Sequence, residues 1–349
     1  MSRRTRKPKS SDTGHSGNVL ADVAADARLD EGPEGVRRVL RAIYRAGSMP
    51  VRDLSRETGL PVPVVAAVRG ELEKRGWLER RGGVVLSSSG RVAVEEQLGL
   101  SCRRRFQRPV FPVLDDEMRS LRARMEALGE RRPAVDVRLD QSHATAETAL
   151  RRAVYLYEHD GLEGRDVLIL GDDDLTSLAI GLLADFFGVS VRRVVVLECD
   201  PRLVAFLNAA SRETRQAVEA VEHDLRAELP ADLLAGFDLF FTDPPYTLSG
   251  LSLFVSRGAA GLRPEVGKQG IVCFGSRRPD ETATAVGTIT ETGLAPVEVI
   301  PDFNRYVGAQ MLAGVSHLIR TVATTRLTPR VNGFYEGSLY TADRSRKMG

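Results

Sequence analysis

The chain of 349 residues is 42% hydrophobic and 28% charged, with a formal net charge of +2, so it can bury two or three globular cores and is not a fibrous or disordered protein. It has no apolar run of about 18 residues, and its first residues lack the apolar core of a signal peptide, so we expect a cytoplasmic protein without membrane contact. Three cysteines that lie far apart argue against a disulfide framework or a zinc site, and no metal is expected.

Charge is divided unevenly along the chain. Residues 1–110 contain 22 Lys and Arg against 13 Asp and Glu, a balance of +9. The totals of 49 and 47 leave 27 and 34 for residues 111–349, a balance of −7. The basic front part favours nucleic acid or another acidic surface as a partner, and the acidic remainder favours a cation.

Residues 1–100 divide into a polar arm and a small domain. Residues 1–30 show little apolar periodicity and contain a basic cluster, which predicts a disordered basic arm. Over residues 31–100, apolar spacing predicts three short helices, the second ending before Gly59, and a hairpin that turns at Gly82 and Gly83. This α+β pattern resembles a winged helix.

A winged helix admits two roles. In a DNA-binding domain, Arg69, Lys74 and Arg75 near the third helix would meet phosphates. Winged helices also serve as packing or dimerisation modules, and the sequence leaves both roles open. We further expect the chain to form a homodimer.

Behind this domain, residues 101–134 are predicted to be a connector with a charged helix from Asp115 to Glu130. A larger domain is predicted over residues 135–325, and residues 326–349 are predicted to be a flexible tail. The larger domain begins with a strand-to-helix junction in which Asp140, Gln141 and Glu147 add more polarity than a helix cap requires. We expect these three residues to border the substrate site.

The larger domain alternates strands and helices. Apolar strand candidates lie at residues 167–170, 194–198, 237–242, 270–274 and 296–300, and a closing run lies at 312–322. This alternation predicts an α/β fold with a Rossmann-like, class I methyltransferase-like, doubly wound parallel sheet. In such a sheet the ligand lies beyond the carboxyl ends of the strands, so the residues that follow each strand are the site candidates.

The first strand ends in Gly171, which three consecutive carboxylates follow, Asp172, Asp173 and Asp174. A nucleotide-binding corner usually carries a Gly-x-Gly loop, because glycine lets the backbone approach the ligand closely. Here only one glycine remains. Acids at a helix start suit the helix dipole, and one of them caps the helix, which accounts for one aspartate but not for three.

The next two strand ends carry candidates for binding a nucleoside. Glu198 is placed to accept hydrogen bonds from both ribose hydroxyls, and Asp200 follows it closely. Asp224 and Leu225 are suited to contact an adenine amino group and ring face. A simple turn at Asp224 is the alternative.

The strand at 237–242 ends in Asp243, two prolines, Tyr246 and Thr247. This type of motif is typical of enzymes that bring an amine nitrogen to a sulfonium carbon, where acceptor groups take the N–H hydrogens and the lone pair points at the electrophile. The alternative is a rigid turn with a solvated aspartate. Asp302 and Asn304 are weaker candidates for contacting the acceptor.

Together, the front domain, the Gly-Asp-Asp-Asp run from Gly171 and the Asp-Pro-Pro-Tyr-Thr run from Asp243 resemble the branched-chain polyamine synthases, the N4-bis(aminopropyl)spermidine synthases. The resemblance implies transfer of aminopropyl groups from decarboxylated S-adenosylmethionine, as co-substrate, to the secondary amine of spermidine. Methylthioadenosine would leave, and no prosthetic group is implied.

The residues agree with this implication. S-adenosylmethionine carries a carboxylate that its decarboxylated form lacks, and like charges at 4 Å repel by about 4 kcal/mol at an effective dielectric constant of 20. Asp172, Asp173 and Asp174 would therefore select the decarboxylated donor. Asp243 would orient and deprotonate the acceptor amine, and Tyr246 would pack against the cation.

Two other functions compete with this interpretation. A nucleic-acid amino-methyltransferase that uses S-adenosylmethionine shares the Asp-Pro-Pro-Tyr motif, but it predicts a carboxylate-tolerant glycine loop. A DNA-binding regulator that senses a polyamine would show salt-dependent DNA binding without turnover.

Overall fold

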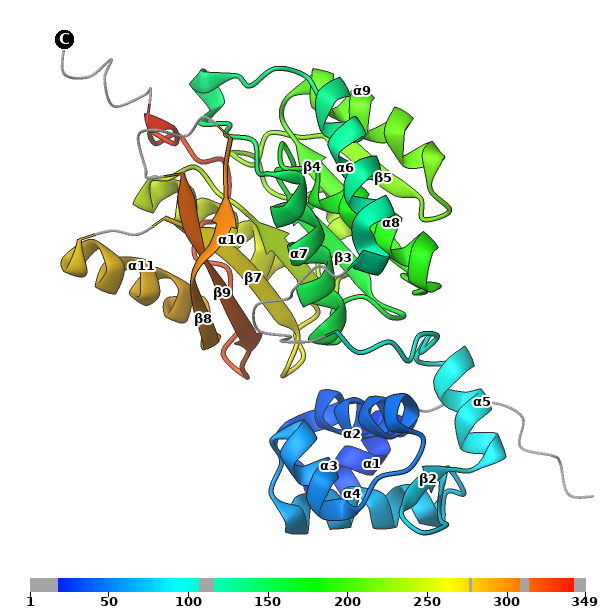
Figure 1. Cartoon of the computed structure of the whole chain (residues 1–349). Helices are drawn as coiled ribbons and strands as arrows, with labels where there is room; N and C mark the ends of the chain where they lie inside the picture. Colours follow the sequence, from blue (N-terminus) through cyan, green and yellow to red (C-terminus); the bar gives the residue numbers. More distant parts are fainter. Residues whose placement is uncertain (1–17, 107–115, 276–277, 308–313, 342–349) are drawn as a thin grey trace, which may run out of the picture.

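The computed structural model describes residues 18–106, 116–275, 278–307 and 314–341, which form a small front domain and a larger sheet domain (Figure 1). The winged helix is confirmed. Helix α1 packs on α2 and buries Val23 and Ala24, so the arm predicted over residues 1–30 is helical in its last part, while residues 1–17 lie outside the described ranges. The elements of the front domain are α1 (Val19–Asp26), α2 (Gly32–Ala46), α3 (Val51–Thr58), α4 (Val62–Lys74), β1 (Leu78–Arg80), β2 (Val84–Leu86) and α5 (Ser88–Glu96).

Within the described residues, the sheet of the larger domain has seven strands in the order β5-β4-β3-β6-β7-β9-β8, of which the first five are parallel and the last two pair antiparallel. This confirms the doubly wound parallel sheet and adds an antiparallel edge. The strands are β3 (Asp166–Leu170), β4 (Arg193–Glu198), β5 (Val218–Glu222), β6 (Leu239–Thr242), β7 (Gln269–Phe274), β8 (Leu294–Arg305) and β9 (Val315–Ala323).

Strand β5 was missing from the predicted strands, although Asp224 was treated as a strand-end residue. The residues of β5, Val218 to Glu222, alternate between buried and more exposed side chains, because β5 is the edge strand of the parallel part. An alternating edge strand lacks the continuous apolar run that marks a central parallel strand.

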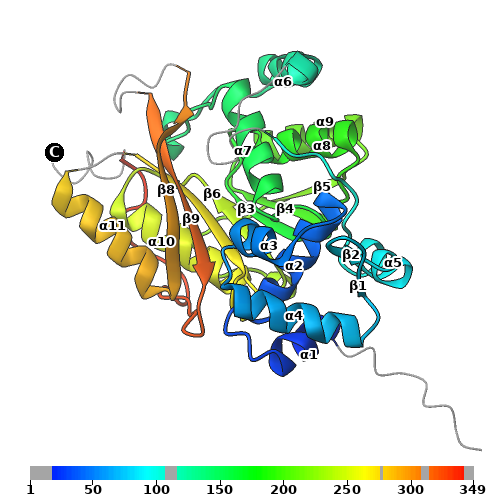
Figure 2. The same ribbon diagram turned by 60° about the horizontal axis from the view of Figure 1, so that its bottom comes forward.

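Helices cover both faces of the sheet (Figures 1 and 2). Val167 and Ile169 of β3 face one core with α6, α7, α8 and α9, whereas Leu168 and Leu170 face a second core with α10 and α11. Helix α6 matches the predicted charged helix, but it packs on α7 and α8 as part of the larger domain. These helices and the 3₁₀ turns are η1 (Asp116–Met118), α6 (Arg119–Arg131), η2 (Val137–Leu139), α7 (Ala146–Glu158), α8 (Thr176–Phe187), α9 (Pro201–Ala210), η3 (Ser211–Glu213), η4 (Ala231–Leu233), α10 (Leu248–Gly261) and α11 (Pro279–Glu291).

The segment after β9 differs from the predicted flexible tail over residues 326–341, and residues 342–349 lie outside the described ranges. Leu339 is 1% exposed and Tyr340 is 7% exposed, and both belong to the core beside α10. The guanidinium of Arg257 donates to the carbonyl oxygens of Val331 at 3.0 Å and Gly333 at 2.7 Å. Buried side chains and satisfied carbonyls therefore hold this segment against the larger domain.

No helix within the described ranges is both long and apolar enough to cross a membrane.

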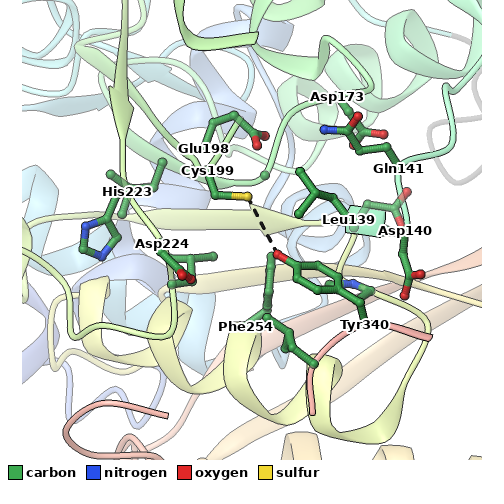
Figure 3. Close-up of a pocket in the computed structure, with 16 residues that line it drawn as sticks. Leu139, Asp140, Gln141, Asp173, Glu198, Cys199, His223, Asp224, Phe254 and Tyr340 are labelled. Atoms are coloured by element: carbon green, nitrogen blue, oxygen red, sulfur yellow. Dashed lines mark hydrogen bonds between the residues drawn. The ribbon is translucent and has the colours of Figure 1, made fainter. Parts of the chain in front are cut away.

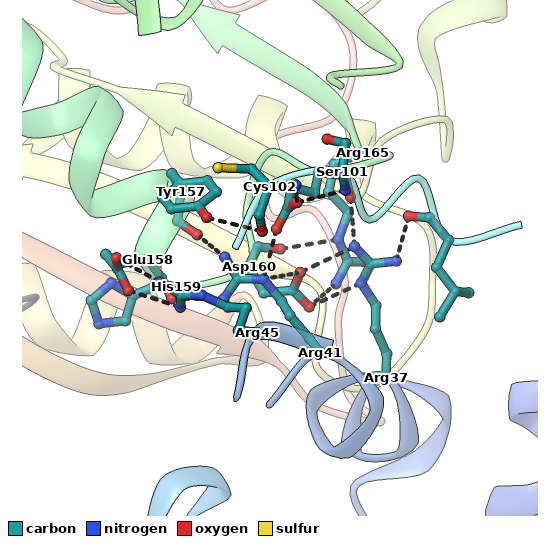
Figure 4. Close-up of polar contacts among 12 residues, drawn as sticks. Arg37, Arg41, Arg45, Ser101, Cys102, Tyr157, Glu158, His159, Asp160 and Arg165 are labelled. Atoms are coloured by element: carbon teal, nitrogen blue, oxygen red, sulfur yellow. Dashed lines mark hydrogen bonds and ion pairs between the residues drawn. The ribbon is translucent and has the colours of Figure 1, made fainter. Parts of the chain in front are cut away.

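Buried ion pairs join the two domains (Figure 4). Arg37, Arg41 and Arg45 recur every fourth residue of α2 and so share one face of that helix. They reach the C-terminal end of α7 and the loop after it: Arg37 pairs with Asp160 at 2.9 Å, Arg41 donates to the Tyr157 carbonyl at 2.6 Å, and Arg45 pairs with Glu158 at 2.8 Å.

A second interdomain cluster surrounds Glu34 of α2, whose carboxylate accepts from Arg165 at 2.6 Å and from Lys268 at 2.6 Å. Arg165 immediately precedes β3 and Lys268 immediately precedes β7. The front domain therefore contacts the amino-terminal edge of the parallel strands, opposite the edge where the predicted site lies.

We expect Glu34→Gln to destabilise the protein by about 3–5 kcal/mol, because it leaves buried cations with less compensation. Burial alone would raise the pKa of Glu34, but Arg165 and Lys268 hold it below its usual range. The stabilisation is therefore complete above the carboxyl's unfolded pKa and is lost as the pH falls toward the folded value. Urea unfolding at pH 7 and at pH 3 measures both effects.

Glu96→Gln provides the control for this measurement, since Glu96 is exposed on α5 and its substitution is expected to change stability by less than about 0.5 kcal/mol. Equal stability of the two variants at pH 7 would contradict the role assigned to Glu34.

Candidate active site

The carboxyl ends of β3, β4 and β6 and the loop after β5 meet at one cavity, as expected for a parallel sheet. Figure 3 shows Asp173, Glu198 and Asp224 around it, with the ring of Tyr340 reaching in from the C-terminal segment. The residues that line the cavity are Leu139, Asp140, Gln141, Gly171, Asp173, Leu197, Glu198, Cys199, His223, Asp224, Leu225, Asp243, Pro245, Phe254, Leu339 and Tyr340.

The loop after β3 begins at Gly171, whose φ of +73° lies in the left-handed region that favours glycine. The carboxylate of Asp172 then turns into the start of α8, where it accepts from the backbone N–H groups of Thr176 at 2.7 Å and Ser177 at 3.1 Å. Asp172 therefore satisfies free N–H groups at the start of α8, whose N-cap residue is Leu175, and it does not line the cavity.

Asp174 is also directed away from the cavity. Its carboxylate accepts from the Ala144 N–H at 2.5 Å and forms a buried ion pair with Arg152 at 2.6 Å. Of the three aspartates only Asp173 lines the cavity, where it accepts from the Ser142 N–H at 3.0 Å. The sequence predicts that three carboxylates select the donor, and the structure places one of them at the cavity.

The charge on Asp173 is poorly compensated. Burial, followed by the negative charges of Asp174, Glu198 and Asp243, raises its pKa well above the usual range. A cation that enters the cavity would relieve this repulsion, so Asp173 favours a positively charged ligand.

Glu198 lines the cavity as predicted, and the backbone holds it in place. One carboxylate oxygen accepts from the Asp172 N–H at 3.0 Å and the other from the Asp200 N–H at 2.9 Å. Asp200 itself caps α9 and pairs with Arg202 at 2.6 Å, and it does not line the cavity. Asp200 thus supports Glu198 through its backbone.

The other predicted contact residues divide into two groups. Asp140, Gln141, Asp224 and Leu225 line the cavity, and Asp140 accepts from the Thr341 N–H at 2.9 Å, which ties η2 to the C-terminal segment. Glu147 does not reach the cavity, because it pairs with Arg151 at 2.6 Å in the first turns of α7.

Asp243 lines the cavity and is held by two groups that the sequence analysis did not identify. Its Oδ2 accepts from Arg152 at 2.6 Å and from the Tyr306 hydroxyl at 2.5 Å. Burial raises the pKa of Asp243 to about 7, against the lowering effect of Arg152. A carboxylate with this pKa exchanges protons readily near neutral pH.

The two residues after the Asp-Pro-Pro run lie behind the cavity lining. The Tyr246 ring packs edge-to-face on Tyr306, with ring centroids 6.3 Å apart. The Thr247 hydroxyl caps α10 and also donates to the Leu339 carbonyl at 2.7 Å. Thr247 therefore anchors the C-terminal segment, and neither residue lines the cavity.

Sequence reasoning missed Arg152 and the cavity contact of Tyr340. The available signal for Arg152 was its spacing, three residues after Ala149 and four before Leu156, which places it on the helix face that these two apolar residues share. Asn304 is buried and bonds Arg152 at 2.8 Å, whereas Asp302 is exposed on β8.

The cavity is acidic. Five carboxylates line it, and within the described ranges no lysine or arginine does. Apolar contacts come from Leu139, Leu225 and Phe254, which suit the faces of a nucleobase. A ligand with an adenosine-like part and a cationic part complements this lining.

The fold is Rossmann-like and of the class I methyltransferase type, and the cavity lining suits a ligand with a nucleoside part and a cationic part. Residues 120–341 match the family described as the branched-chain polyamine synthase A C-terminal domain, and residues 36–79 match a winged helix-turn-helix DNA-binding family. Since the first match covers more than half of the chain, this protein belongs to the branched-chain polyamine synthase family.

Relatives named N(4)-bis(aminopropyl)spermidine synthase match parts of the chain that differ in length. It is 31% identical to the N(4)-bis(aminopropyl)spermidine synthase of Thermococcus kodakarensis over 285 residues, which are 78% of this chain and 77% of the relative. It is 42% identical to that of Thermus thermophilus over 142 residues, 41% and 40% of the two chains. The crystal structure of the branched-chain polyamine synthase from Thermus thermophilus, in complex with N4-aminopropylspermidine and 5'-methylthioadenosine, superposes with a TM-score of 0.57 at 27% identity and covers 93% of this chain and 98% of that one.

Proposed function

We propose that this protein transfers aminopropyl groups from decarboxylated S-adenosylmethionine to the secondary amine of spermidine, giving N4-bis(aminopropyl)spermidine and methylthioadenosine. The observation that carries the proposal is the cavity lined by five carboxylates and, among the described residues, by no lysine or arginine. A donor that retained its methionine carboxylate would meet repulsion there, and a polyamine would be attracted. The Thermus thermophilus relative binds a branched polyamine and methylthioadenosine.

The donor is held by three strand ends. Glu198 accepts from the ribose hydroxyls, Asp224 and Leu225 contact the adenine, and Asp173 attracts the aminopropyl ammonium. Two backbone N–H groups already fix the Glu198 carboxylate, so little side-chain entropy is lost when the ribose binds.

Asp243 orients and deprotonates the acceptor. The secondary amine of a polyamine is mostly protonated at neutral pH, so its proton must leave before the lone pair attacks. Asp243 takes this proton, the nitrogen bonds to the methylene carbon next to sulfur, and the carbon–sulfur bond breaks. Its electron pair stays on sulfur, and neutral methylthioadenosine leaves.

Mass spectrometry of the polyamine product tests the reaction. Incubation with spermidine and the decarboxylated donor should add one and then two aminopropyl units, whereas S-adenosylmethionine should add nothing. Methyl addition to spermidine or to nucleic acid, without aminopropyl addition, would overturn the proposal.

The pH dependence of kcat/KM should show an acidic limb near pH 7. Asp243 acts as a base in its ionised form, so activity should fall about tenfold per pH unit as the pH drops below its folded pKa of about 7. Steady-state kinetics between pH 5.5 and 9, in buffers of constant ionic strength, measure this limb, which should be absent from the residual activity of Asp243→Asn.

The front domain supports packing more than nucleic-acid binding. It contacts the sheet edge opposite the cavity, so it does not border the reacting groups. Near α4, Arg69 pairs with Glu73 and Lys74 pairs with Glu71, and the first half of the helix carries no basic residue. DNA binding by this domain and the expected homodimer stay predictions. A DNA titration at several salt concentrations checks the first, and the molar mass in solution checks the second.

A further inference from the structure

Arg152 is a fully buried charge in the middle of α7, with 0% of its surface exposed. It does not line the cavity. Burying a guanidinium is costly unless its N–H groups and its charge are both satisfied. Its partners therefore indicate what the charge is for.

Each of the five N–H donors of Arg152 has a partner. Nε donates to Asn304 at 2.8 Å and Nη1 to Asp174 at 2.6 Å and Thr176 at 3.3 Å. Nη2 donates to Asp243 at 2.6 Å and to the Tyr306 hydroxyl at 3.2 Å. These partners belong to the loop after β3, the start of α8, the end of β6, and the region of β8.

We propose that Arg152 is a positioning residue of the transfer reaction, which fixes the carboxylate of Asp243 toward the acceptor and compensates the charge of Asp174. This inference rests on the function proposed above. Arg152 and Tyr306 both bind Oδ2 of Asp243, and two such contacts hold a carboxylate in one rotamer. Tyr306 is itself held by the Ser316 hydroxyl at 2.7 Å.

The same contacts tune proton transfer. The titratable groups around Asp243 are Arg152 from α7, Asp173 and Asp174 from the loop after β3, Tyr246 from its own loop, Cys273 from β7 and Tyr306 beyond β8. Arg152 is the cation of this set, and the other groups carry negative charge when ionised. Without Arg152, the pKa of Asp243 would rise further, and the base would be protonated at neutral pH.

The test compares Arg152→Met, Arg152→Lys and the double variant Arg152→Met/Asp174→Asn. We expect Arg152→Met to move the acidic limb of kcat/KM upward by about 1–3 pH units. Arg152→Lys keeps the positive charge but loses the planar guanidinium with its paired N–H donors. The acidic limb should therefore return toward the pH at which wild type shows it, while kcat stays about 10-fold to 100-fold below that of wild type. Arg151→Met, which removes the neighbouring arginine, should leave the limb unmoved.

The double variant separates positioning from stability. It removes a buried cation together with one of its two acids, so the melting temperature should recover relative to Arg152→Met. Because Asp174 also raises the pKa of Asp243, the reference for the pH profile is Asp174→Asn alone, and the limb of the double variant should lie above the limb of that single variant. A recovered melting temperature with a limb equal to that of Asp174→Asn would show that Arg152 only stabilises the fold and would overturn the inference.

Failure of the inference can be told apart from failure of the proposed function. If the wild-type enzyme adds no aminopropyl group, the function is wrong. Carboxyl ¹³C NMR titration of Asp243, assigned with Asp243→Asn, still measures the effect of Arg152 without any turnover. An Asp243 pKa that is equal in wild type and Arg152→Met would overturn the inference by itself.

Discussion

Asp243→Asn is expected to lower kcat by about 10²-fold to 10⁴-fold at pH 8, the usual contribution of a general base. Asparagine keeps the size of the side chain and a carbonyl oxygen that accepts from Arg152 or Tyr306, but it cannot take the acceptor's proton. Binding of methylthioadenosine should change less than about threefold, because that product carries no proton to transfer. Single-turnover kinetics and calorimetry measure the two quantities separately.

Asp232→Asn provides the control for this result, since Asp232 is exposed on η4 and away from the cavity lining. Near-normal turnover by Asp243→Asn would show that another group takes the proton. Asp173 would then be the first residue to examine. It also lines the cavity, and its charge is poorly compensated; it belongs to the Asp-rich loop, that is Asp172 to Asp174 after β3.

Asp173→Asn should relax the choice of donor. The ratio of kcat/KM for decarboxylated S-adenosylmethionine over S-adenosylmethionine should fall by up to about 10³-fold, the equivalent of the 4 kcal/mol that two like charges exert at 4 Å and a dielectric constant of 20. The effect arises because Asp173 is the member of the Asp-rich loop that faces the cavity. Competition between the two donors, followed by mass spectrometry of the product, measures this ratio.

Asp172→Asn is the matched control, one residue away. The amide oxygen of asparagine keeps the hydrogen bond from the Thr176 N–H and loses the one from the Ser177 N–H, so α8 should be retained at a modest cost in stability. Because Asp172 faces the helix, donor choice should be unchanged. If both variants relaxed the choice equally, the net charge of the loop would matter more than the direction of each side chain.

The sequence was enough to predict the sheet, the winged helix and eight of the sixteen residues that line the cavity. Gly171, Glu198 and Asp243 were found because each stands at the end of an apolar strand candidate, and parallel strands bring their carboxyl ends to one edge. That rule needs only strand order along the chain. It located the site without any knowledge of side-chain direction.

The sequence could not decide which carboxylates face the ligand. In the loop after β3, Gly171 has φ +73° and Leu175 has φ +59°, both in the left-handed region. Between these two residues, the carboxylate of Asp172 points to the start of α8 and that of Asp174 points to Arg152. The three consecutive aspartates thus have three different environments. Asp172 accepts from N–H groups at the start of α8, Asp173 lines the cavity, and Asp174 pairs with Arg152. Such directions depend on the packing of the whole loop.

The tertiary structure also decided which distant residues complete the site. Arg152 lies 91 positions before Asp243, and Leu339 and Tyr340 reach the cavity from a segment predicted to be a free tail. No local pattern connects such residues, because a buried charge is tolerated only where separate elements bring its partners together. The sequence by itself therefore determined the acidic composition of this cavity, and the folded chain determined which of the acids face it and which residues hold Asp243 in position.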